Sequence, residues 1–575
     1  MKYELIQERN KQLSLLLQVL TNRGIKNVEG YLHTDDSYIL DPLKLDNMSG
    51  GVRMFLDNQK KKSKVFLLVD SDTDGYTSAA VIYNYAYRMW PDWVESNWTY
   101  YLHETKTHGL KDCIDKILEE DYDFILIPDA GSNDYEEIET LYFKNKDVLI
   151  LDHHEAEKTT NKAVVINNQL GSYPTKSLTG AGIVYKFCQR LDSVLNVEIA
   201  DCFLDLVVAG LIADVADLRD LETHRIVEKG LLHIYSPLLQ TIIDKNDYTL
   251  KGKLNPKGIS FSVAPIINSI TRIGTLDEKE MLFKSMLERF ACTLIPSEKR
   301  GHKGEPVQLV EEAYRIASNV RNRQNKIRDG KLTELLELIE TNNLADNKIL
   351  VVQDPVSNGD ETGITGLVAN QLMSKYKKPV LLLHATEKDG EIIWEGSARN
   401  APNTELHNLK DFVSNSNLVE MAQGHQSAFG VAIKDSKIND FINYSNEALK
   451  DIDFSTSFLV DDIINYSDVD DKDIISIYHA RDIWAQGIEE PTIAILNIPV
   501  SSSNVYSNDK LIKIETNRVD YIKFKPTLDE MDLFNGINKR KTINVVGVCS
   551  YNEFDKRAQI LILDYEFNTD SFWDF

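Results

Sequence analysis

In the first part of the chain, apolar runs of strand length alternate with amphipathic stretches of helix length. The run at 65–69, Val-Phe-Leu-Leu-Val, is uninterrupted and bounded by charged residues, which is typical of a strand buried on both faces of a parallel sheet. Strands separated by helices join through right-handed crossovers, so we expect an α/β fold with a doubly wound parallel sheet. The predicted elements are strands at 65–69, 124–127 and 148–151 and helices at 77–87, 135–144, 179–190 and 200–212.

The pattern divides the rest of the chain into four regions. Residues 1–60 form a polar, helical N-terminal segment, and 306–345 form one long charged connecting helix that only Gly330 interrupts. A second, smaller α/β unit follows at 346–454, and short alternating strands at 455–575 are typical of a small β-barrel or sandwich. The elements predicted in these last two regions are strands at 348–352, 379–383, 492–498, 511–516, 520–525, 542–549 and 559–564 and a helix at 363–375.

Composition narrows the class of protein. Hydrophobic residues make up 42% of the 575, and the five cysteines are widely spaced, which fits several buried cores in a reducing compartment. No apolar run approaches the roughly 20 residues of a membrane span, and the N-terminus has no apolar signal core. We therefore expect a cytoplasmic protein without a membrane partner. The net charge of −25 disfavours nucleic acid as a partner, unless acidic residues surround metal ions and basic residues line a groove.

Acidic residues follow the three predicted strands at 65–69, 124–127 and 148–151, and the last of these is also followed by two histidines. Residues 70–75 read Asp-Ser-Asp-Thr-Asp-Gly, 128–132 read Pro-Asp-Ala-Gly-Ser and 152–154 read Asp-His-His, while a later helical segment carries Asp214 and Asp217. Ligands of α/β sheets bind beyond the carboxyl ends of the strands, so these side chains should converge. Crowded carboxylates repel one another unless cations lie among them. Asp oxygens with an imidazole suit Mn²⁺ or Mg²⁺, and this many ligands can hold two ions about 4 Å apart.

Each motif taken alone has a simpler interpretation. Residues 70–75 are similar to a calcium-binding loop, but the sequence lacks the bidentate Glu that such a loop needs after its Gly. A His-His pair alone is more often a surface or packing feature, and 128–132 alone is a turn. The common position of these motifs at strand ends favours a metal site.

As a set, the motifs resemble those of the DHH phosphoesterase superfamily, which is named after the Asp-His-His element found here at 152–154. Within it, the chain is similar to RecJ-type single-strand exonucleases over about residues 65–567. The segments that carry this similarity are 173–176, 178–182, 264–274, 363–369, 396–399, 424–430 and 487–491. The domains that it implies are a DHH catalytic domain at 61–305, a DHH-associated substrate-binding domain at 346–454 and an oligonucleotide-binding (OB-like) barrel at 455–575.

The chain departs from the family pattern at three positions. Ile266 replaces an Arg, Gln423 replaces a Gly, and His108 stands where the family tends to have Tyr. The first 60 and the last eight residues match no part of the pattern. All the expected metal positions are present, which disfavours an inactive relative.

The resemblance also implies roles at the metal centre. The expected ligands of two Mn²⁺ or Mg²⁺ ions are Asp70, Asp72, Asp129, His153 and Asp214, with Asp129 bridging the ions. The expected catalytic residues are Asp74, Asp152 and His154. Asp152 should orient the imidazoles, and His154 should donate a hydrogen bond to the scissile phosphate, with a third nitrogen ligand as its alternative role. Asp74 is a further ligand, or it closes the turn through Gly75.

Substrate contacts are expected in both later domains and at the end of the first. By resemblance, the contacting residues are Arg272, Asn268, Ser397, Arg399, Gly424 and His425. In the β-rich region, aromatic and basic residues alternate at 521–525, so Lys523 and Phe524 should follow the backbone and stack on bases. The alternative is that Phe524 lies in the core. The acidic, aromatic end at 570–575 is a candidate for docking on a basic protein groove.

Three functions of different class are consistent with these observations. The resemblance favours a metal-dependent exonuclease on single-stranded DNA, running 5′ to 3′, in DNA repair, recombination or replication. The alternatives are a phosphodiesterase of short oligoribonucleotides or cyclic dinucleotides and an inactive DNA-binding scaffold of a replication complex. The β-rich region after the second α/β unit favours a polymer substrate. Single-stranded DNA is the expected partner, and a single-strand-binding protein or a helicase is a candidate partner.

Overall fold

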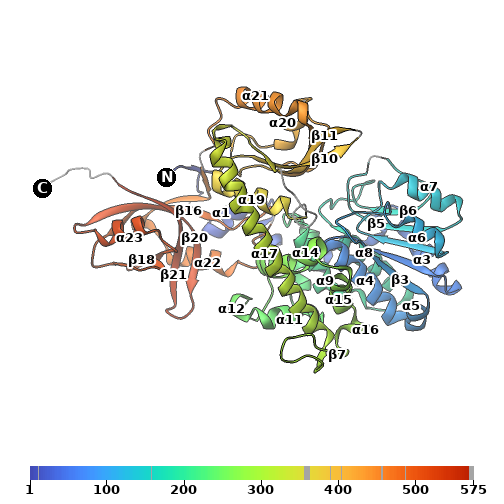
Figure 1. The fold of residues 1–575 in the computed structure, drawn as a ribbon. Coiled ribbons are helices and arrows are strands. Elements are labelled where there is room, and N and C mark those ends of the chain that lie inside the picture. Colours follow the sequence, from blue (N-terminus) through green and yellow to red (C-terminus); the bar gives the residue numbers. More distant parts are fainter. Residues whose placement is uncertain are drawn as a thin grey trace. The chain divides into compact units, whose positions relative to one another are not determined.

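The computed structural model describes residues 1–10, 12–156, 158–250, 252–354, 363–388, 390–402, 404–454, 457–485 and 487–568 (Figure 1). The chain forms two compact units. The first, here the parallel-sheet unit, comprises Glu29–Lys326 and Asp482–Ile488. The second, here the mixed-sheet unit, comprises Met1–Val28, Ile327–Arg481 and Glu489–Phe575.

The parallel-sheet unit is built on five parallel strands in the order β3-β2-β4-β5-β6. The three predicted strands are present, and the sequence missed the two edge strands. β3 is mostly half-exposed and β6 has only four residues, so neither carries the long apolar run of a central strand. The strands are β2 (Val65–Val69), β3 (Trp98–Leu102), β4 (Phe124–Pro128), β5 (Asp147–Asp152) and β6 (Val164–Asn167).

Helices cover both faces of this sheet. On one face, Phe66, Ile125 and Val148 pack with apolar residues of α6 (Ile114–Glu119) and α7 (Tyr135–Phe143). The opposite face is covered by α3 (Met48–Lys61), α4 (Thr73–Met89) and α8 (Gly180–Leu195). The central strands are buried throughout because both of their faces are covered. The predicted doubly wound α/β fold is thus confirmed.

Further elements extend the unit beyond this sheet. No helix within the described ranges is both long enough and apolar enough to cross a bilayer. These elements are α2 (Val28–Leu32), α5 (Pro91–Asn97), α9 (Leu204–Ala213), α10 (Leu221–Gly230), α11 (Pro237–Lys245), α12 (Asp247–Leu250), α13 (Pro256–Gly258), the π-helix η4 (Ile259–Val263), α14 (Ala264–Ile273), α15 (Leu276–Met286), α16 (Glu288–Ala291), β7 (Leu294–Pro296) and β8 (Pro306–Gln308).

The predicted connecting helix is a single helix of 33 residues, α17 (Leu309–Thr341), which begins in the parallel-sheet unit and ends in the other (Figure 1). Gly330 lies inside it, and a Cβ at this glycine would meet no atom within 4 Å. The glycine therefore weakens the helix locally without being needed for packing.

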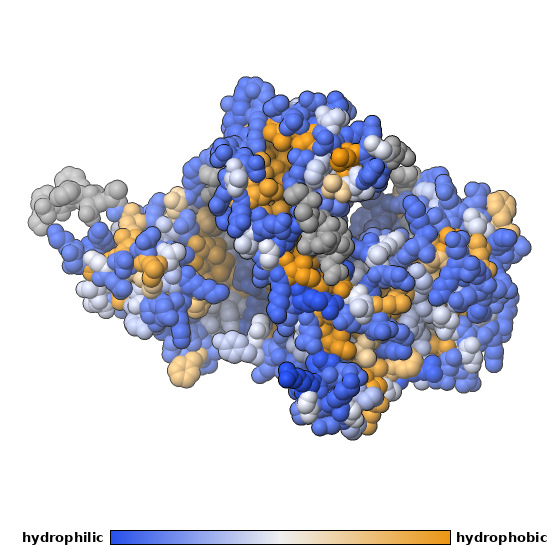
Figure 2. Space-filling view, viewed as in Figure 1, coloured by the Kyte–Doolittle hydropathy of each residue, from blue (hydrophilic) through white to orange (hydrophobic). Residues whose placement is uncertain are grey.

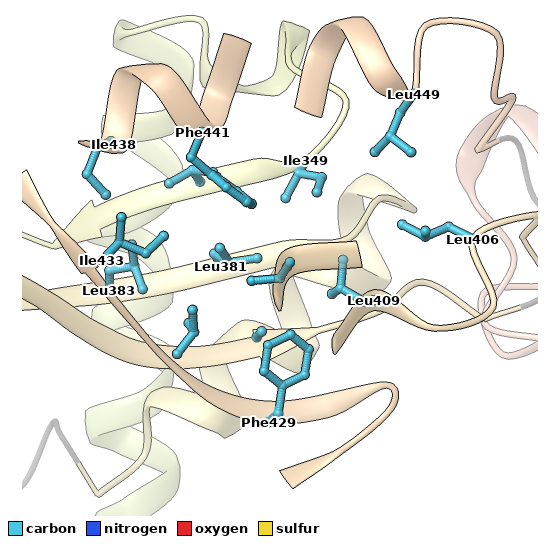
Figure 3. Packing of buried hydrophobic residues seen from close by; sticks show 14 of the residues in the cluster. Ile349, Leu381, Leu383, Leu406, Leu409, Phe429, Ile433, Ile438, Phe441 and Leu449 are labelled. Atoms are coloured by element: carbon cyan, nitrogen blue, oxygen red, sulfur yellow. The ribbon is translucent and has the colours of Figure 1, made fainter. Parts of the chain in front are cut away.

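The mixed-sheet unit holds a five-stranded sheet in the order β12-β13-β11-β10-β9, in which β9 and β10 are parallel and the other neighbours antiparallel. One face packs on helices through a core that includes Leu381, Phe429 and Phe441 (Figure 3). The elements are β9 (Leu350–Asp354), α19 (Thr365–Tyr376), β10 (Val380–Lys388), β11 (Glu391–Arg399), α20 (Leu409–Asn415), β12 (Met421–His425), β13 (Ala428–Lys434) and α21 (Ile438–Ala448).

The C-terminal region forms a seven-stranded sheet in the order β15-β16-β20-β21-β19-β18-β17. All five strands predicted there are present. Within the described residues the ladder runs from β15 to β17 without a pairing between these two edges, so the closed barrel stays a prediction. The elements are β15 (Asp462–Asn465), α22 (Asp471–His479), β16 (Thr492–Val500), β17 (Val505–Ser507), β18 (Leu511–Ile514), β19 (Asp520–Phe524), α23 (Leu528–Asn535), β20 (Lys541–Asn552) and β21 (Arg557–Phe567).

Residues 1–60, which the sequence predicts to be helical, contain a short strand as well as helices. The chain begins with a strand, β1 (Tyr3–Leu5), which pairs in parallel with β14 (Phe458–Val460). After α1 (Leu15–Asn22), Arg23 forms a bidentate ion pair with the fully buried Asp461. Only the part after Val28 belongs to the parallel-sheet unit. The sequence analysis extended the helical periodicity of the leucines in α1 to the whole segment and so missed the short strand before it.

Candidate metal centre and substrate contacts

Three adjacent strands deliver acidic residues to one edge of the parallel sheet. Asp70 follows β2, Asp129 follows β4, and Asp152 ends β5. The chain passes from β2 to the edge strand β3 and returns to β4, so the winding direction reverses between β2 and β4, where such sheets bind ligands. Asp129 has a φ of 64°, a left-handed conformation that Asp tolerates better than most residues.

Eight carboxylate and imidazole groups gather at this edge in three overlapping sets, whose ligand atoms lie within 4.8 Å of one another. Asp129 and His153 each belong to two sets. Nε2 of His153 lies 3.2 Å from Oδ1 of Asp129 and 3.5 Å from Oδ2 of Asp214. All five predicted metal ligands are therefore brought together. The sets are Asp70 with Asp72 and Asp129; Asp74 with His153 and Asp214; and Asp129 with Asp152, His153 and His154.

Two glycines allow helices to approach these carboxylates closely. A Cβ at Gly180, the first residue of α8, would lie 2.3 Å from Oδ1 of Asp129. A Cβ at Gly210 of α9 would lie 2.3 Å from Oδ1 of Asp74. Any larger residue at either position would displace an acidic side chain of the site.

Asp74 is anchored by the N-terminus of α8. Its carboxylate accepts a hydrogen bond from the hydroxyl of Thr179 at 2.9 Å and from the next two backbone amides at 2.7 and 3.1 Å. The alternative role predicted for Asp74 belongs to Asp72, whose Oδ1 accepts the N–H of Gly75 at 3.1 Å and caps α4. Asp74 thus positions the start of α8 and faces His153 at 4.0 Å.

The carboxylates suit cations because they are buried close together. Burial, followed by the charges of the other Asp residues, raises the pKa of Asp129 well above its usual range and raises that of Asp214 to about 8. Oδ1 of Asp129 is buried and has no hydrogen bond within the described residues. Divalent cations would relieve this repulsion and satisfy that oxygen. The set of oxygens with one or two imidazole nitrogens fits Mn²⁺ or Mg²⁺.

The two histidines of the Asp-His-His element have different surroundings. Burial lowers the pKa of His153, which favours the neutral imidazole that a metal requires. Asp152 accepts hydrogen bonds from Nδ1 of His154 at 2.8 Å and from the backbone amide of Ser132 at 3.0 Å. Burial opposes protonation of His154, but the hydrogen bond and charge of Asp152 outweigh it and raise the pKa to about 9. His154 is half-exposed and is therefore a cation near neutral pH.

The sequence missed two further histidines around Asp70. Nδ1 of His108 lies 2.5 Å from Oδ2 of Asp70, and Nε2 of His103 lies 3.7 Å from Oδ1. His103 is buried and its Nδ1 contacts Asp112 at 2.8 Å. It follows β3 directly, so recognition of that strand would have placed it at the sheet edge. His108 was noted only as a departure from the family pattern.

Two predicted substrate contacts of α14 lie beside the metal loop. Oδ1 of Asn268 accepts hydrogen bonds from the backbone N–H and the hydroxyl of Thr73, at 3.1 and 2.9 Å, so this residue supports the loop. Burial lowers the pKa of Arg272, and the charge of Asp72 opposes that shift. The guanidinium of Arg272 has no hydrogen bond or ion pair within the described residues, which leaves it available to an anion.

The predicted contacts in the mixed-sheet unit converge at one end of its sheet. Strand register aligns Arg399 of β11 with Ala428 of β13 and His425 of β12. Ser397 lies two residues away on the same face of β11, and Gly424 precedes His425 with a φ of 128°. A Cβ at Gly366, near the start of α19, would lie 2.4 Å from a terminal nitrogen of Arg399 and 3.5 Å from the hydroxyl of Ser397. We call the four predicted contacts, Ser397, Arg399, Gly424 and His425, the arginine corner.

The predicted aromatic stripe at 521–525 is only partly exposed. Tyr521 is fully buried, which excludes it from base stacking, because the burial of β19 does not alternate strictly. Lys523 lies 3.6 Å from Glu530, and Phe524 is 58% exposed. The acidic end at 570–575 lies outside the described residues.

Comparison with known proteins identifies relatives along the whole chain. Residues 64–211 match the model of the "DHH family, N-terminal domain". The "Putative SPbeta prophage-derived single-strand DNA-specific exonuclease YorK" of Bacillus subtilis (strain 168) is 34% identical over 575 residues, covering 98% of both chains. The single-stranded-DNA-specific exonuclease RecJ of the same organism is 25% identical over 96% of this chain and 67% of its own.

A solved structure has the same fold. The crystal structure of RecJ from Thermus thermophilus in complex with Mn²⁺ covers 97% of this chain and 77% of its own chain, with a TM-score of 0.72 and 17% sequence identity. The fold agrees with the resemblance seen in the motifs, and the relative with 34% identity extends that agreement over nearly the whole sequence. The chain belongs to the DHH superfamily and, within it, to the RecJ-like proteins.

Proposed function

We propose that this chain is a metal-dependent exonuclease that hydrolyses the phosphodiester bonds of single-stranded DNA, from 5′ to 3′, in DNA repair, recombination or replication in the cytoplasm. The observation that carries the proposal is the sharing of Asp129 between two sets of ligand atoms, with His154, hydrogen-bonded to Asp152, beside them. Two divalent ions held there would neutralise phosphate charge and lower the pKa of an attacking water.

Residues of this chain provide the remaining steps. His154, oriented by Asp152, donates a hydrogen bond to a non-bridging oxygen of the scissile phosphate, where negative charge grows during attack. Arg272 offers its desolvated guanidinium to a phosphate, and Asn268 keeps the metal loop in place. The arginine corner supplies a second set of donors suited to phosphate oxygens.

The relatives support the choice of substrate. The names of YorK and of the RecJ proteins specify single-stranded DNA, and RecJ of Thermus thermophilus was crystallised with Mn²⁺ and with Mg²⁺. The 5′ to 3′ direction and the pathway rest on resemblance alone. Phe524 in the C-terminal sheet is a candidate for base stacking on longer strands.

One time course tests the proposal. Purified protein is incubated with Mn²⁺ and the same DNA sequence as a 5′-labelled strand, a 3′-labelled strand and a duplex, alongside an RNA strand and a dinucleotide. We expect rapid release of the 5′ label from single-stranded DNA and no product in the presence of a chelator. Preferential cleavage of the dinucleotide or the RNA would favour the small-substrate phosphodiesterase, and no cleavage of any substrate would favour the scaffold.

A further inference from the structure

Along the continuous helix formed by η4 and α14, most of the residues that are not buried lie in a single line. Between Ile259 and Ile273, the residues that are not buried are Ser260, Phe261, Pro265, Asn268 and Arg272. The last four are spaced by four, three and four residues, which places them on one face of a helix. We call these four residues the α14 stripe.

The C-terminal end of the α14 stripe lies at the metal loop. Asn268 accepts two hydrogen bonds from Thr73. Arg272 is largely desolvated beside Asp72. This end of the stripe therefore lies beside the loop that carries Asp72.

The N-terminal end of the α14 stripe carries an aromatic ring among cations. Phe261 is 66% exposed and belongs to a π-helical turn, a feature that is frequent at functional sites. Arg321 of α17 donates a hydrogen bond to the carbonyl oxygen of Phe261 at 3.4 Å, and Lys257 is exposed one turn earlier. Figure 2 shows that most of the surface in this view is hydrophilic, with hydrophobic residues in small groups among it.

We propose that Phe261 is a stacking platform for one base of the bound single strand, at a fixed distance from the phosphate held by Arg272. Eleven residues separate the two side chains, which corresponds to about 16 Å along a helix. At the stacked spacing of about 3.4 Å this distance spans no more than about five nucleotides, and fewer if the strand is extended. Aromatic stacking tolerates every base, as a nuclease without sequence preference requires. This inference rests on the proposed function, because it assigns a contact to the same substrate.

A double-mutant cycle between the protein and the DNA tests the contact. We measure kcat/KM for the first cleavage by the Mn²⁺-loaded full-length enzyme on an intact strand and on strands with one abasic site at each of positions two to six from the 5′ end. We expect Phe261→Ala to lower kcat/KM about tenfold on the intact strand, within the range for one stacked base. One abasic position should cause a similar loss in the wild type and no further loss in Phe261→Ala. Phe261→Trp should restore the rate.

Phe143→Ala is the matched control. Phe143 ends α7 and is 69% exposed, so its replacement removes the same side chain with similar exposure, but before β5 and therefore away from the carboxyl ends of the strands. Phe143→Ala should leave kcat/KM unchanged on the intact strand and on every abasic strand. The inference would be overturned if the losses from Phe261→Ala and from every abasic site simply multiplied. It would also be overturned if Phe261→Ala cleaved the intact strand at the wild-type rate. Neither result would affect the proposed function. Failure of the wild type to cleave the intact strand would overturn the proposed function as well.

Discussion

The metal edge of the parallel sheet and the arginine corner of the mixed sheet place functional groups by different means. At the metal edge, Asp70, Asp129 and Asp152 are almost fully buried, and hydrogen bonds or close packing fix them. In the arginine corner, strand register aligns Arg399 with His425, and Arg399 donates a hydrogen bond to the carbonyl oxygen of Ala398. His425 is exposed to solvent.

This difference separates two physical requirements. Hydrolysis needs ligand atoms held within a fraction of an ångström, which a buried and mutually supported set provides. Retention of a flexible polyanion needs charge at the surface, where small displacements matter little and salt screens the interaction. Substitutions at the metal edge should therefore change turnover, and those in the arginine corner should change affinity.

The largest effect is expected from Asp129→Asn. The amide preserves the shape of the side chain and tolerates the left-handed φ of 64°, but it removes the shared charge. We expect the rate with Mn²⁺ to fall by at least about a thousandfold, together with the bound-metal content measured by elemental analysis. An unchanged circular dichroism spectrum is the control for folding, and a near wild-type rate would contradict the two-ion proposal.

His154→Gln should reduce turnover without removing metal. The amide still occupies the site but cannot carry the positive charge that Asp152 stabilises. Loss of one donor to a developing negative charge lowers kcat by roughly 10²- to 10³-fold. We expect KM to change little. A lower metal content in this variant would instead assign His154 as a ligand.

Gly180→Ala tests whether close packing positions the metal edge. The new Cβ would lie 2.3 Å from Oδ1 of Asp129, so the carboxylate must move, and a displacement of about 1 Å can cost about a hundredfold in rate. Gly330→Ala is the matched control inside α17, where nothing lies within 4 Å. It should keep full activity and stabilise the helix by about 0.5–1 kcal/mol, measured by thermal unfolding. Equal activity of the two variants would show that the close approach of Gly180 to Asp129 is not needed for activity.

Arg399→Ala should weaken binding about tenfold and leave kcat nearly unchanged. The guanidinium lies against the start of α19 and beside Ser397, and one lost phosphate contact lowers the slope of log affinity against log salt by about 0.7 for a single strand. Lys388→Ala, which removes an exposed cation paired with Glu395, is the control. A salt slope equal to that of the wild type would remove Arg399 from the path of the strand.

The sequence predicts the metal edge better than the arginine corner, and the reason is physical. Long apolar runs identify β2, β4 and β5, so the residues after them could be placed at one edge by the topology of parallel sheets. β3 lacks such a run, and His103 was missed with it. The anchoring of Asp74 by α8 could not be predicted, because it depends on how closely a helix more than 100 residues later approaches the sheet.

Strand register is the information that the sequence lacks elsewhere. The alignment of Arg399 with His425 depends on pairing through β13, which local patterns do not specify. In β19 the local pattern was also insufficient, since the alternation of aromatic and basic residues at 521–525 does not reveal that Tyr521 is fully buried. Family motifs compensated for missing register in the arginine corner, whereas β19 has no such motif.

The smallest expected effect concerns a buried histidine that belongs to neither region. His224 stacks on Tyr31 with ring centroids 3.9 Å apart, and burial lowers its pKa to about 4. The unfolded chain binds a proton at about pH 6.5, so between pH 6.5 and 4 the unfolded state holds more protons and stability falls as the pH falls. His224→Phe should flatten this dependence by up to about 1.4 kcal/mol per pH unit, measured by chemical unfolding at fixed pH values, whereas replacement of the exposed His233 by Phe should not. Because the metal edge also contains groups with shifted pKa values, the difference between wild type and His224→Phe isolates the fold from the site. If the free energy of unfolding depended equally on pH in both proteins, His224 would be hydrated in solution. The metal edge and the arginine corner would then be distinguished only by their effects on catalysis.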